Sequence, residues 1–464
     1  MKFALPFVAL LALPLLSFSQ AQEAQLLSQW TDPTITPTSW LNGRFNDIWG
    51  MPINGKEFAI IGSTAGMHFI DVSDPEDISE VEAAFVPGAA QGPDLVHRDF
   101  KNFGKYLYAV ADEGQSTLQI IDMSYLPDST HIVYNSNTLL KRTHNVYIDT
   151  LNARLYACGP TLNSGGASLR ILSLSDPENP TILGTYPNGA LDLPYVHDAY
   201  VRDHVAYLNC GNDGFWVVDF TDPQNPQVLG TMTSYVQSGY NHSGWLNTEG
   251  DYYFLADETH GKDIKSVAVS DLGDINVAET FDATSPEQKS IPHNLLMREN
   301  LLYVSYYYDG LQVFDLSDPL NPERVAYYDT YAGVNNGSYQ GAWGVYPFLP
   351  SGIVLISDMQ GGLFVFEKIE LLSGLSESKK TASGARVFPQ PSTGTATLEF
   401  SWHNPAGECR IGLFHPDGRE VFRKDDIPVG QGFNRIEIEL PQHLSNGLYF
   451  LKMEGTGIPL LLWR

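Results

Sequence analysis

Five histidines recur at a regular spacing and are the residues in this sequence with the clearest capacity for chemistry. Each stands at the start of a hydrophobic segment, and successive members lie 45 to 53 residues apart. The 464-residue chain has only 12 histidines, so composition alone would not produce this column. Its members are His97, His144, His197, His242 and His293. Neutral imidazole is a common ligand of zinc, copper and iron, so the histidine column predicts a metal or substrate site.

Acidic and thiol side chains form a second column, one hydrophobic segment further along each unit. An antiparallel return strand would bring its end back to the face where the histidines lie. The members are Asp112, Glu113, Cys158, Cys210, Asp257, Glu258, Asp309 and Asp358. Asp112, Asp257 and Glu258 are the predicted additional metal ligands, and the others could orient the imidazoles. Each carboxylate could instead serve a turn, and the two cysteines could ligate, pair with each other or remain buried thiols.

The elements that must position these residues form a sequence repeat. Hydrophobic strands break into polar turns such as "SDPENP", "TDPQNP" and "SDPLNP", in which proline ends the strand and Asp and Asn stabilise the turn. Seven such strands follow one another at intervals of 46 to 52 residues. A period of this length, with room for four strands per unit, is typical of a β-propeller. We therefore expect an all-β fold, namely a seven-bladed β-propeller followed by a small β-sandwich-like C-terminal domain.

In a propeller, the first strand of each unit runs beside the central channel. The histidine column would then surround one channel mouth, where the first and seventh units offer Asp47 and Trp343. Trp49 and Trp245 are expected near the same mouth, mostly in packing roles. Alternation along the strand predicts that Asp198, beside His197, points away from the channel.

The two ends of the chain differ in character from the repeat. Residues 1–21 have a positive start, an apolar run and small residues before Gln22, which predicts a signal peptide. The propeller is expected over residues 22–370, with 24–30 supplying the outer strand of the last blade. Residues 371–384 read as a flexible linker, and residues 385–464 as the C-terminal domain.

Composition excludes some partners. The chain carries 54 acidic and 27 basic residues, a net charge of −27, which repels nucleic acid. No later segment is long and apolar enough to be a transmembrane segment. Three cysteines allow at most one disulfide, so the fold does not rest on a disulfide framework.

Two known families resemble parts of the chain. The segments "VFPQPSTG", "IGLFHPDGREV" and "LSNGLYFLKM" are similar to the type IX secretion system sorting domain of Bacteroidetes. This resemblance implies export by the type IX secretion machinery to the cell surface or the medium. The "DLSDPLNP" turns with "VHDAY" and "PHNLL" resemble the LVIVD-repeat propellers of the choice-of-anchor B group. That resemblance implies a propeller fold and a surface location but no reaction.

Three functions remain open at this stage. The first is a metalloprotein with zinc, copper, iron or calcium at the channel mouth. The second is a non-catalytic surface protein that binds glycan or protein at the same face, and the third is a structural ring of histidines without metal. The sequence contains no zincin helix, Walker loop, dinucleotide glycine motif or serine nucleophile elbow, so whether the chain is an enzyme also stays open.

Overall fold

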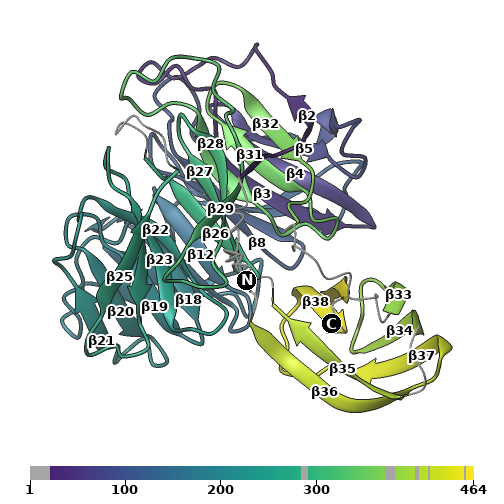
Figure 1. The fold of residues 1–464 in the computed structure, drawn as a ribbon. Coiled ribbons are helices and arrows are strands. Elements are labelled where there is room, and N and C mark those ends of the chain that lie inside the picture. Colours follow the sequence, from purple (N-terminus) through teal and green to yellow (C-terminus); the bar gives the residue numbers. More distant parts are fainter. Residues whose placement is uncertain are drawn as a thin grey trace, which may run out of the picture.

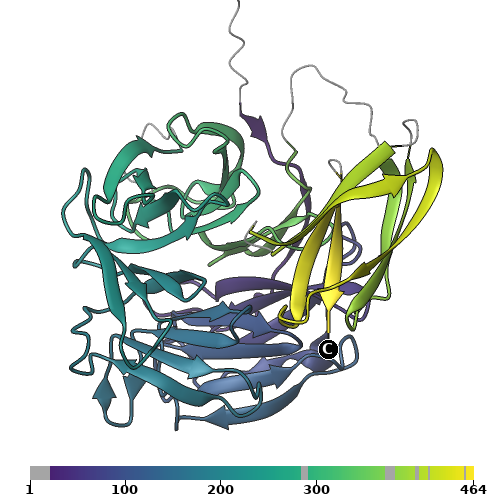
Figure 2. The same cartoon turned by 90° about the horizontal axis from the view of Figure 1, so that it is seen from below.

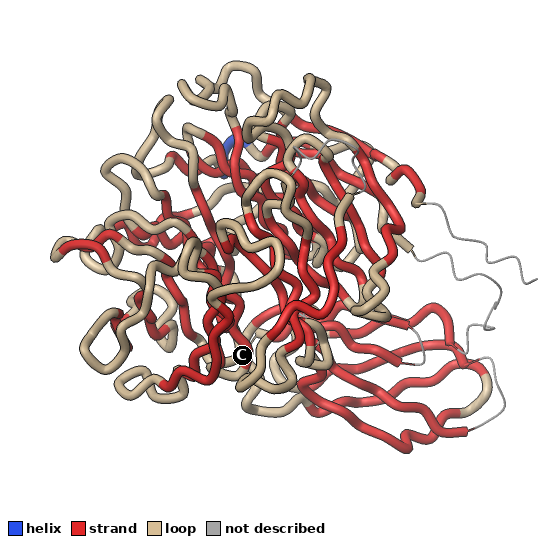
Figure 3. Tube along the Cα trace, turned by 60° about the vertical axis from the view of Figure 1, so that its left-hand side comes forward, coloured by secondary structure: helices blue, strands red, loops and turns tan. Residues whose placement is uncertain are grey.

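The computed structural model describes residues 21–283, 291–370, 382–402, 407–415, 419–453 and 456–463. All but the last residue of the predicted signal peptide (1–21) and most of the predicted linker (371–384) lie outside these ranges. Strand β33 (Ala382–Phe388) includes the last three residues of the predicted linker. The described residues form strands and loops with one short 3-10 helix, η1 (Glu82–Ala84) (Figure 3). No helix among them has the length and apolar character needed to cross a membrane.

Seven sheets of four or five strands, together with one two-stranded hairpin, make up the described part of residues 21–370, and we number the seven as blades in chain order. Each blade starts with its innermost strand and proceeds outward through antiparallel neighbours. Blades 1 and 2 contain β3 (Phe45–Ile53), β4 (Lys56–Ser63), β5 (Gly66–Asp71), β6 (Ser79–Glu80) and β7 (Val86–Pro87); then β8 (Arg98–Phe103), β9 (Tyr106–Ala111), β10 (Leu118–Asp122) and β11 (His131–Ser136). Blades 3 and 4 contain β12 (Asn145–Asp149), β13 (Arg154–Cys158), β16 (Leu169–Ser173) and β17 (Thr181–Tyr186), with the side hairpin β14 (Thr161–Leu162) and β15 (Gly165–Gly166); then β18 (Asp198–Arg202), β19 (Val205–Asn209), β20 (Phe215–Asp219) and β21 (Gln227–Met232).

The remaining blades follow the same plan and take up the N-terminal strands. Blades 5 and 6 contain β22 (Asn241–Leu246), β23 (Tyr252–Asp257), β24 (Ile264–Ala268) and β25 (Asn276–Phe281); then β26 (Asn294–Arg298), β27 (Leu301–Tyr306), β28 (Gly310–Asp315), β29 (Glu323–Tyr328) and β1 (Gln22–Glu23). Blade 7 contains β30 (Ala342–Tyr346), β31 (Val354–Asp358), β32 (Gly362–Phe366) and β2 (Leu26–Trp30).

The blades close into a ring. The innermost strands contact one another in the order β3, β8, β12, β18, β22, β26 and β30, and β30 contacts β3 again. Figures 1 and 2 show the sheets arranged around this central region. The predicted all-β propeller is therefore confirmed, and its channel is lined by the strands that follow the histidine column.

The Asp-Pro-x-Asn turns owe their shape to side-chain hydrogen bonds. In blade 4 the carboxylate of Asp222 accepts from the backbone N–H of Gln224 at 2.9 Å and from Nδ2 of Asn225 at 2.7 Å. Asp318 and Asn321 repeat the bond between side chains in blade 6, at 2.7 Å. Proline would end a central strand at this point, and the Asp–Asn pair stabilises the reversal. The repeated turn is structural, as predicted.

The N-terminal segment ties the last two blades together. Strand β2 pairs with β32 as the outer strand of blade 7, and the N–H of Glu367 donates to the carbonyl of Gln25 at 2.9 Å. Strand β1 continues to blade 6, where it runs parallel to β29. The predicted outer strand is confirmed by this pairing, which covers the edge that β32 would otherwise expose.

The C-terminal domain is a sandwich of two sheets. One contains β33, β34 (Thr395–Trp402) and β37 (Gly432–Glu439); the other contains β36 (Glu420–Val429), β35 (Gly407–Phe414), β38 (Gly447–Met453) and β39 (Thr456–Leu462). Side chains from both sheets, such as Leu398 and Leu451, share one hydrophobic core.

The sandwich docks on one face of the propeller, shown in yellow in Figures 1 and 2. Thr150 contacts His415 at 2.6 Å, and Glu299 contacts Lys452 at 2.8 Å. Both propeller residues lie in turns between the first and second strands of a blade. The docked face is therefore the one opposite the starts of the innermost strands.

We expect deletion of residues 24–31 to abolish the cooperative thermal unfolding of the propeller, because β32 loses its partner and the ring opens. Circular dichroism and calorimetry of the deletion variant would measure this. Deletion of residues 163–166, the exposed tip of the β14–β15 hairpin, is the control and should leave the transition nearly unchanged. An unaltered transition in the 24–31 deletion would contradict the proposed role of β2.

Candidate metal centre in the histidine ring

The five histidines of the column form a ring of side chains with one tryptophan. Neighbouring ring centroids lie 5.0, 4.1, 4.2 and 4.5 Å apart from His97 through to His293. Trp343 completes the circuit, 4.5 Å from His293 and 5.4 Å from His97. We call this set the histidine ring. Blade 1 contributes no member, because Asp47 lies deeper in the channel.

Backbone hydrogen bonds place the histidines at the starts of the innermost strands. The N–H of His197 donates to the carbonyl of Asn209 at 2.8 Å, and that of His293 donates to Ser305 at 2.9 Å. In blades 5 and 7 the pairing of the first two strands shifts register, which makes His242 and Trp343 the additional residues of a bulge. Bulges re-aim side chains, and here they aim these two rings at the channel mouth.

Three imidazoles donate a hydrogen bond to the backbone of the following blade. Nδ1 of His197 lies 3.1 Å from the carbonyl of His242, and Nδ1 of His242 lies 3.0 Å from that of His293. Nδ1 of His293 lies 2.5 Å from the carbonyl of Trp343. Because a carbonyl can only accept, the proton is on Nδ1 in all three rings. Each Nε2 therefore carries a lone pair when the ring is neutral.

The other two imidazoles bond to carboxylates. Nδ1 of His97 lies 2.5 Å from Glu113, whose second oxygen accepts the backbone N–H of the same histidine at 3.0 Å. Nδ1 of His144 lies 2.9 Å from Asp112. Carboxylates in this position orient an imidazole and fix its tautomer. No hydrogen bond to Nε2 of any of the five histidines is found within the described residues.

Burial keeps the inner imidazoles uncharged. His197, His242 and His293 are 6 %, 4 % and 3 % exposed. Burial, together with the neighbouring imidazoles, lowers the pKa of His197 and His242 well below the ordinary value, and burial lowers the pKa of His293 to about 3. Protonation would place a charge in an apolar setting beside other histidines. These rings are thus in the neutral form that binds metals.

Two groups of side chains bring three donor atoms within 4.8 Å of one another: His97, Asp112 and His144, and His242, Glu258 and His293. In the first group Asp112 already accepts from Nδ1 of His144. In the second, Glu258 faces Nε2 of His242 at 3.8 Å. Its other oxygen accepts the hydroxyl of Tyr307 at 2.5 Å, and burial raises its pKa. The second group thus pairs a carboxylate with an Nε2 lone pair.

Asp257 lies away from the histidine ring. Its side chain is buried, one oxygen accepts from Tyr235 at 2.6 Å, and the other lies 2.6 Å from the ammonium of Lys265. Both oxygens are engaged inside blade 5, so the structure does not bring this predicted ligand to the histidine ring.

The two cysteines of the second column also serve the blades. Cys158 and Cys210 are free and buried among apolar side chains. Burial raises the pKa of both thiols. The sequence left metal ligation, a disulfide and buried free thiols open for these two cysteines. In the structure both are buried free thiols.

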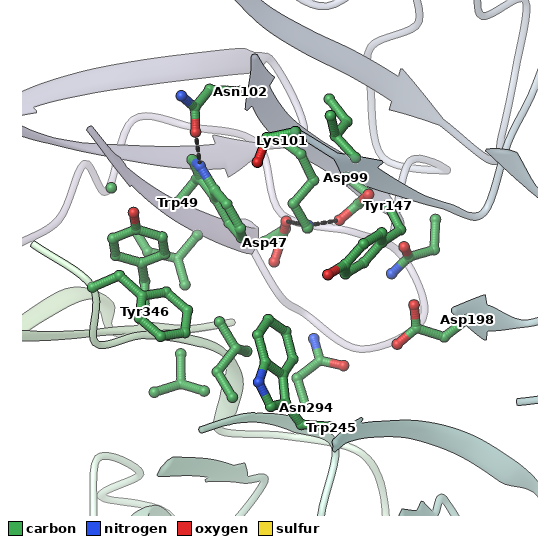
Figure 4. A pocket seen from close by; sticks show the side chains of 18 of the residues that line it. Asp47, Trp49, Asp99, Lys101, Asn102, Tyr147, Asp198, Trp245, Asn294 and Tyr346 are labelled. Atoms are coloured by element: carbon green, nitrogen blue, oxygen red, sulfur yellow. Dashed lines mark hydrogen bonds and ion pairs between the residues drawn. The ribbon is translucent and has the colours of Figure 1, made fainter. Parts of the chain in front are cut away.

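The expected orientation of Asp198 is wrong. Asp198 lines the channel below the histidine ring (Figure 4), and burial raises its pKa to about 7. The alternation argument fails because His197 precedes the first ladder pair of the blade, Asp198 with Asn209. The direction of the His197 side chain is therefore not set by the alternation of side chains along the strand.

Trp49 and Trp245 also differ from expectation. Both line the channel at depth and not at its histidine mouth. Each lies four residues beyond the first residue of its innermost strand, which places it lower on the channel wall. Asp47 lies there too, 3.4 Å from Lys101, which in turn lies 2.7 Å from Asp99. The sequence interpretation missed Lys101, although a lysine inside a strand beside Asp99 was the available signal.

Comparison with known families identifies both parts of the chain. Residues 386–458 match the secretion system C-terminal sorting domain. Residues 293–330 match the LVIVD repeat, and this segment is blade 6, starting at a histidine of the ring. The chain therefore contains an LVIVD repeat within its propeller and a C-terminal type IX secretion sorting domain, which indicates export to the cell surface. Neither match bears on the choice-of-anchor B group, which stays a prediction.

The fold agrees with that of a solved β-propeller. The WD40 beta propeller domain of Doa1 is similar over 75% of this chain and 97% of its own, with a TM-score of 0.50 and 9% identity. The beta-propeller domain of Myceliophteria thermophila Cps50 (Swd1) covers 75% of this chain and 100% of its own, with a TM-score of 0.49 and 10% identity. Likeness at such identity shows the fold alone. No curated protein sequence matches the chain.

We expect Lys265→Met to destabilise the propeller by about 3–5 kcal/mol, because it leaves the Asp257 carboxylate buried without its partner. Urea unfolding would measure the loss. The double variant Asp257→Leu, Lys265→Met should lose less, since neither charge remains. If the double variant loses as much stability as Lys265→Met, the loss does not come from an unpaired buried charge.

Proposed function

We propose that the exported propeller binds one transition-metal ion at the histidine mouth of its channel, through His242, His293 and Glu258. The observation that carries this proposal is the hydrogen bonding of the imidazoles. Every Nδ1 in the ring has an acceptor, and the inner Nε2 atoms keep their lone pairs. Metal-binding histidines in proteins commonly have their second nitrogen held in this way.

Distances support this group as the ligand set. A tetrahedral ion with bonds of about 2.0–2.1 Å holds its donor atoms about 3.4 Å apart. Nε2 of His242 and the nearer oxygen of Glu258 lie 3.8 Å apart, so this pair needs a shift of a few tenths of an ångström. All three donor atoms of the group lie within 4.8 Å of one another. His197, whose ring centroid is 4.2 Å from that of His242, is the candidate for a further ligand.

The donor set also narrows the choice of metal. Two imidazoles with one carboxylate suit zinc, iron or copper. Calcium prefers six or more oxygen ligands, and the group offers a single carboxylate. A bound transition metal would supply Lewis acidity or an activated water at the mouth. His97 and His144, which are more exposed, lie on the opposite side of the ring and would face an incoming ligand.

We expect the purified chain to hold about one equivalent of zinc, copper or iron after supplementation, and the variant His242→Ala, His293→Ala to hold about a tenth of that or less. Elemental analysis of the protein after gel filtration would measure the content. The control is His131→Ala, an exposed residue of an outer strand, which should keep its metal.

The two alternative functions predict other outcomes for the same variants. A structural ring predicts loss of folding with no metal bound in the wild-type chain. A glycan- or protein-binding face predicts loss of ligand binding in a folded, metal-free protein. Less than about 0.1 equivalent in the wild-type chain would exclude the metal site.

We expect Glu258→Gln to abolish tight metal binding and Asp112→Asn to weaken it by no more than about 10–100-fold. The reason is that Glu258 faces an Nε2 atom, whereas Asp112 accepts from Nδ1 of His144. Competition with a chromogenic chelator would give both affinities. Equal losses in the two variants would place the ion at the His97–His144 side of the ring.

A further inference from the structure

The channel contains a partly enclosed cavity directly beneath the histidine ring. Its volume is about 140 Å³, close to the roughly 150 Å³ of an engineered cavity that binds benzene. Four residues that each follow a ring histidine contribute to its lining: Asn145, Asp198, Ser243 and Asn294. The cavity therefore lies between the ring and the docked face of the propeller, and it has room for a small organic molecule.

Aromatic rings form an arc around this cavity. Neighbouring centroids along the arc lie 4.7, 5.5, 5.8 and 6.4 Å apart. In order, the arc consists of Trp49, Tyr346, Phe348, Trp245 and Tyr147. All five line the cavity. Aromatic faces attract organic cations strongly when water is excluded.

The charged groups in the lining are out of balance. Asp47, Asp99 and Asp198 face it, and Lys101 is the single lysine (Figure 4). The ammonium group of Lys101 forms ion pairs with Asp99 at 2.7 Å and with Asp47 at 3.4 Å. Within the described residues Asp198 has no ion-pair partner, and one of its oxygens accepts the backbone N–H of Ala199 at 2.7 Å. A cation bound beside Asp198 would favour the ionised form of its carboxyl group.

One donor in the lining is also unused. The indole N–H of Trp245 is buried and has no hydrogen-bond partner among the described residues. A buried donor without an acceptor costs about 1–3 kcal/mol. A ligand that carries an oxygen acceptor beside its cationic group would satisfy it.

The C-terminal domain closes the cavity from below. His415, Gly447 and Leu448 belong to its lining, and the contact of His415 with Thr150 holds the domain against the channel end. The sorting domain is thus the floor of the cavity. Its removal would open the channel on the face opposite the histidines.

We propose that this cavity is a second binding site, for a small organic ammonium ion with an oxygen acceptor, and that the sorting domain, which forms its floor, restricts access to it. The inference rests on the cavity and not on a metal in the ring. Aromatic faces and Asp198 hold the cation, and Trp245 binds the oxygen. Removal of the sorting domain would then open the site.

The test uses choline as the probe and its uncharged analogue 3,3-dimethylbutan-1-ol as the matched control, with metal removed by EDTA. A specific protease site placed within residues 371–381 allows the purified full chain to be cut and its two parts separated. Titration calorimetry on cut and uncut protein should show choline binding at least tenfold tighter after cutting. The uncharged analogue should bind at least tenfold more weakly than choline.

Point variants of the cut protein check the assigned contacts. Asp198→Asn should weaken choline binding at least tenfold, whereas Asp222→Asn, in an exposed turn, should not. Trp245→Phe should weaken choline more than tetramethylammonium, which has no oxygen. Equal binding of choline and its uncharged analogue, equal binding before and after cutting, or no binding by the cut protein would each overturn the proposal.

Discussion

The hydrogen-bonded pairing of β2 with β32 closes the ring of blades, and every site on the channel axis depends on that closure. A propeller blade buries its faces only against two neighbours, so an open ring would leave two sheets uncovered. The histidines contact each other because seven innermost strands are held at fixed positions around one axis. Residues from the first and last thirds of the chain, such as His97 and Trp343, meet only through this closure.

Within the ring, the two sides differ in what holds the imidazoles. His197, His242 and His293 are buried and bonded to carbonyls, whereas His97 and His144 are more exposed and bonded to carboxylates. A carbonyl and a carboxylate both accept the Nδ1 proton and fix the tautomer of the imidazole. One ring thus combines buried imidazoles held by the backbone with more exposed imidazoles held by carboxylates.

The sequence was a good guide wherever a feature repeats. The repeated turn motif predicts the blades, and the histidine column predicts the histidine ring. The strand-like N-terminal segment predicts how the ring of blades is closed. The sequence failed where a residue departs from its repeat or depends on a distant partner. Asp198 faces the channel because His197 lies outside the ladder, and Asp257 is held by Lys265, a residue with no counterpart in the predicted columns. The docking of the C-terminal domain on the channel depends on surfaces that have no local sequence pattern. The sequence therefore did not predict it.

The imidazole–carbonyl bonds also have a mechanical consequence. Each is donated to the following blade, and they link blades 4, 5, 6 and 7 in series. The hydroxyl of Ser305 reinforces the last link, at 2.7 Å from the carbonyl of Trp343. In blades 2 and 3 the link at the same level is the bond of His144 to the carboxylate of Asp112. Loss of one imidazole–carbonyl bond would therefore weaken the contact between two neighbouring blades as well as the placement of one histidine.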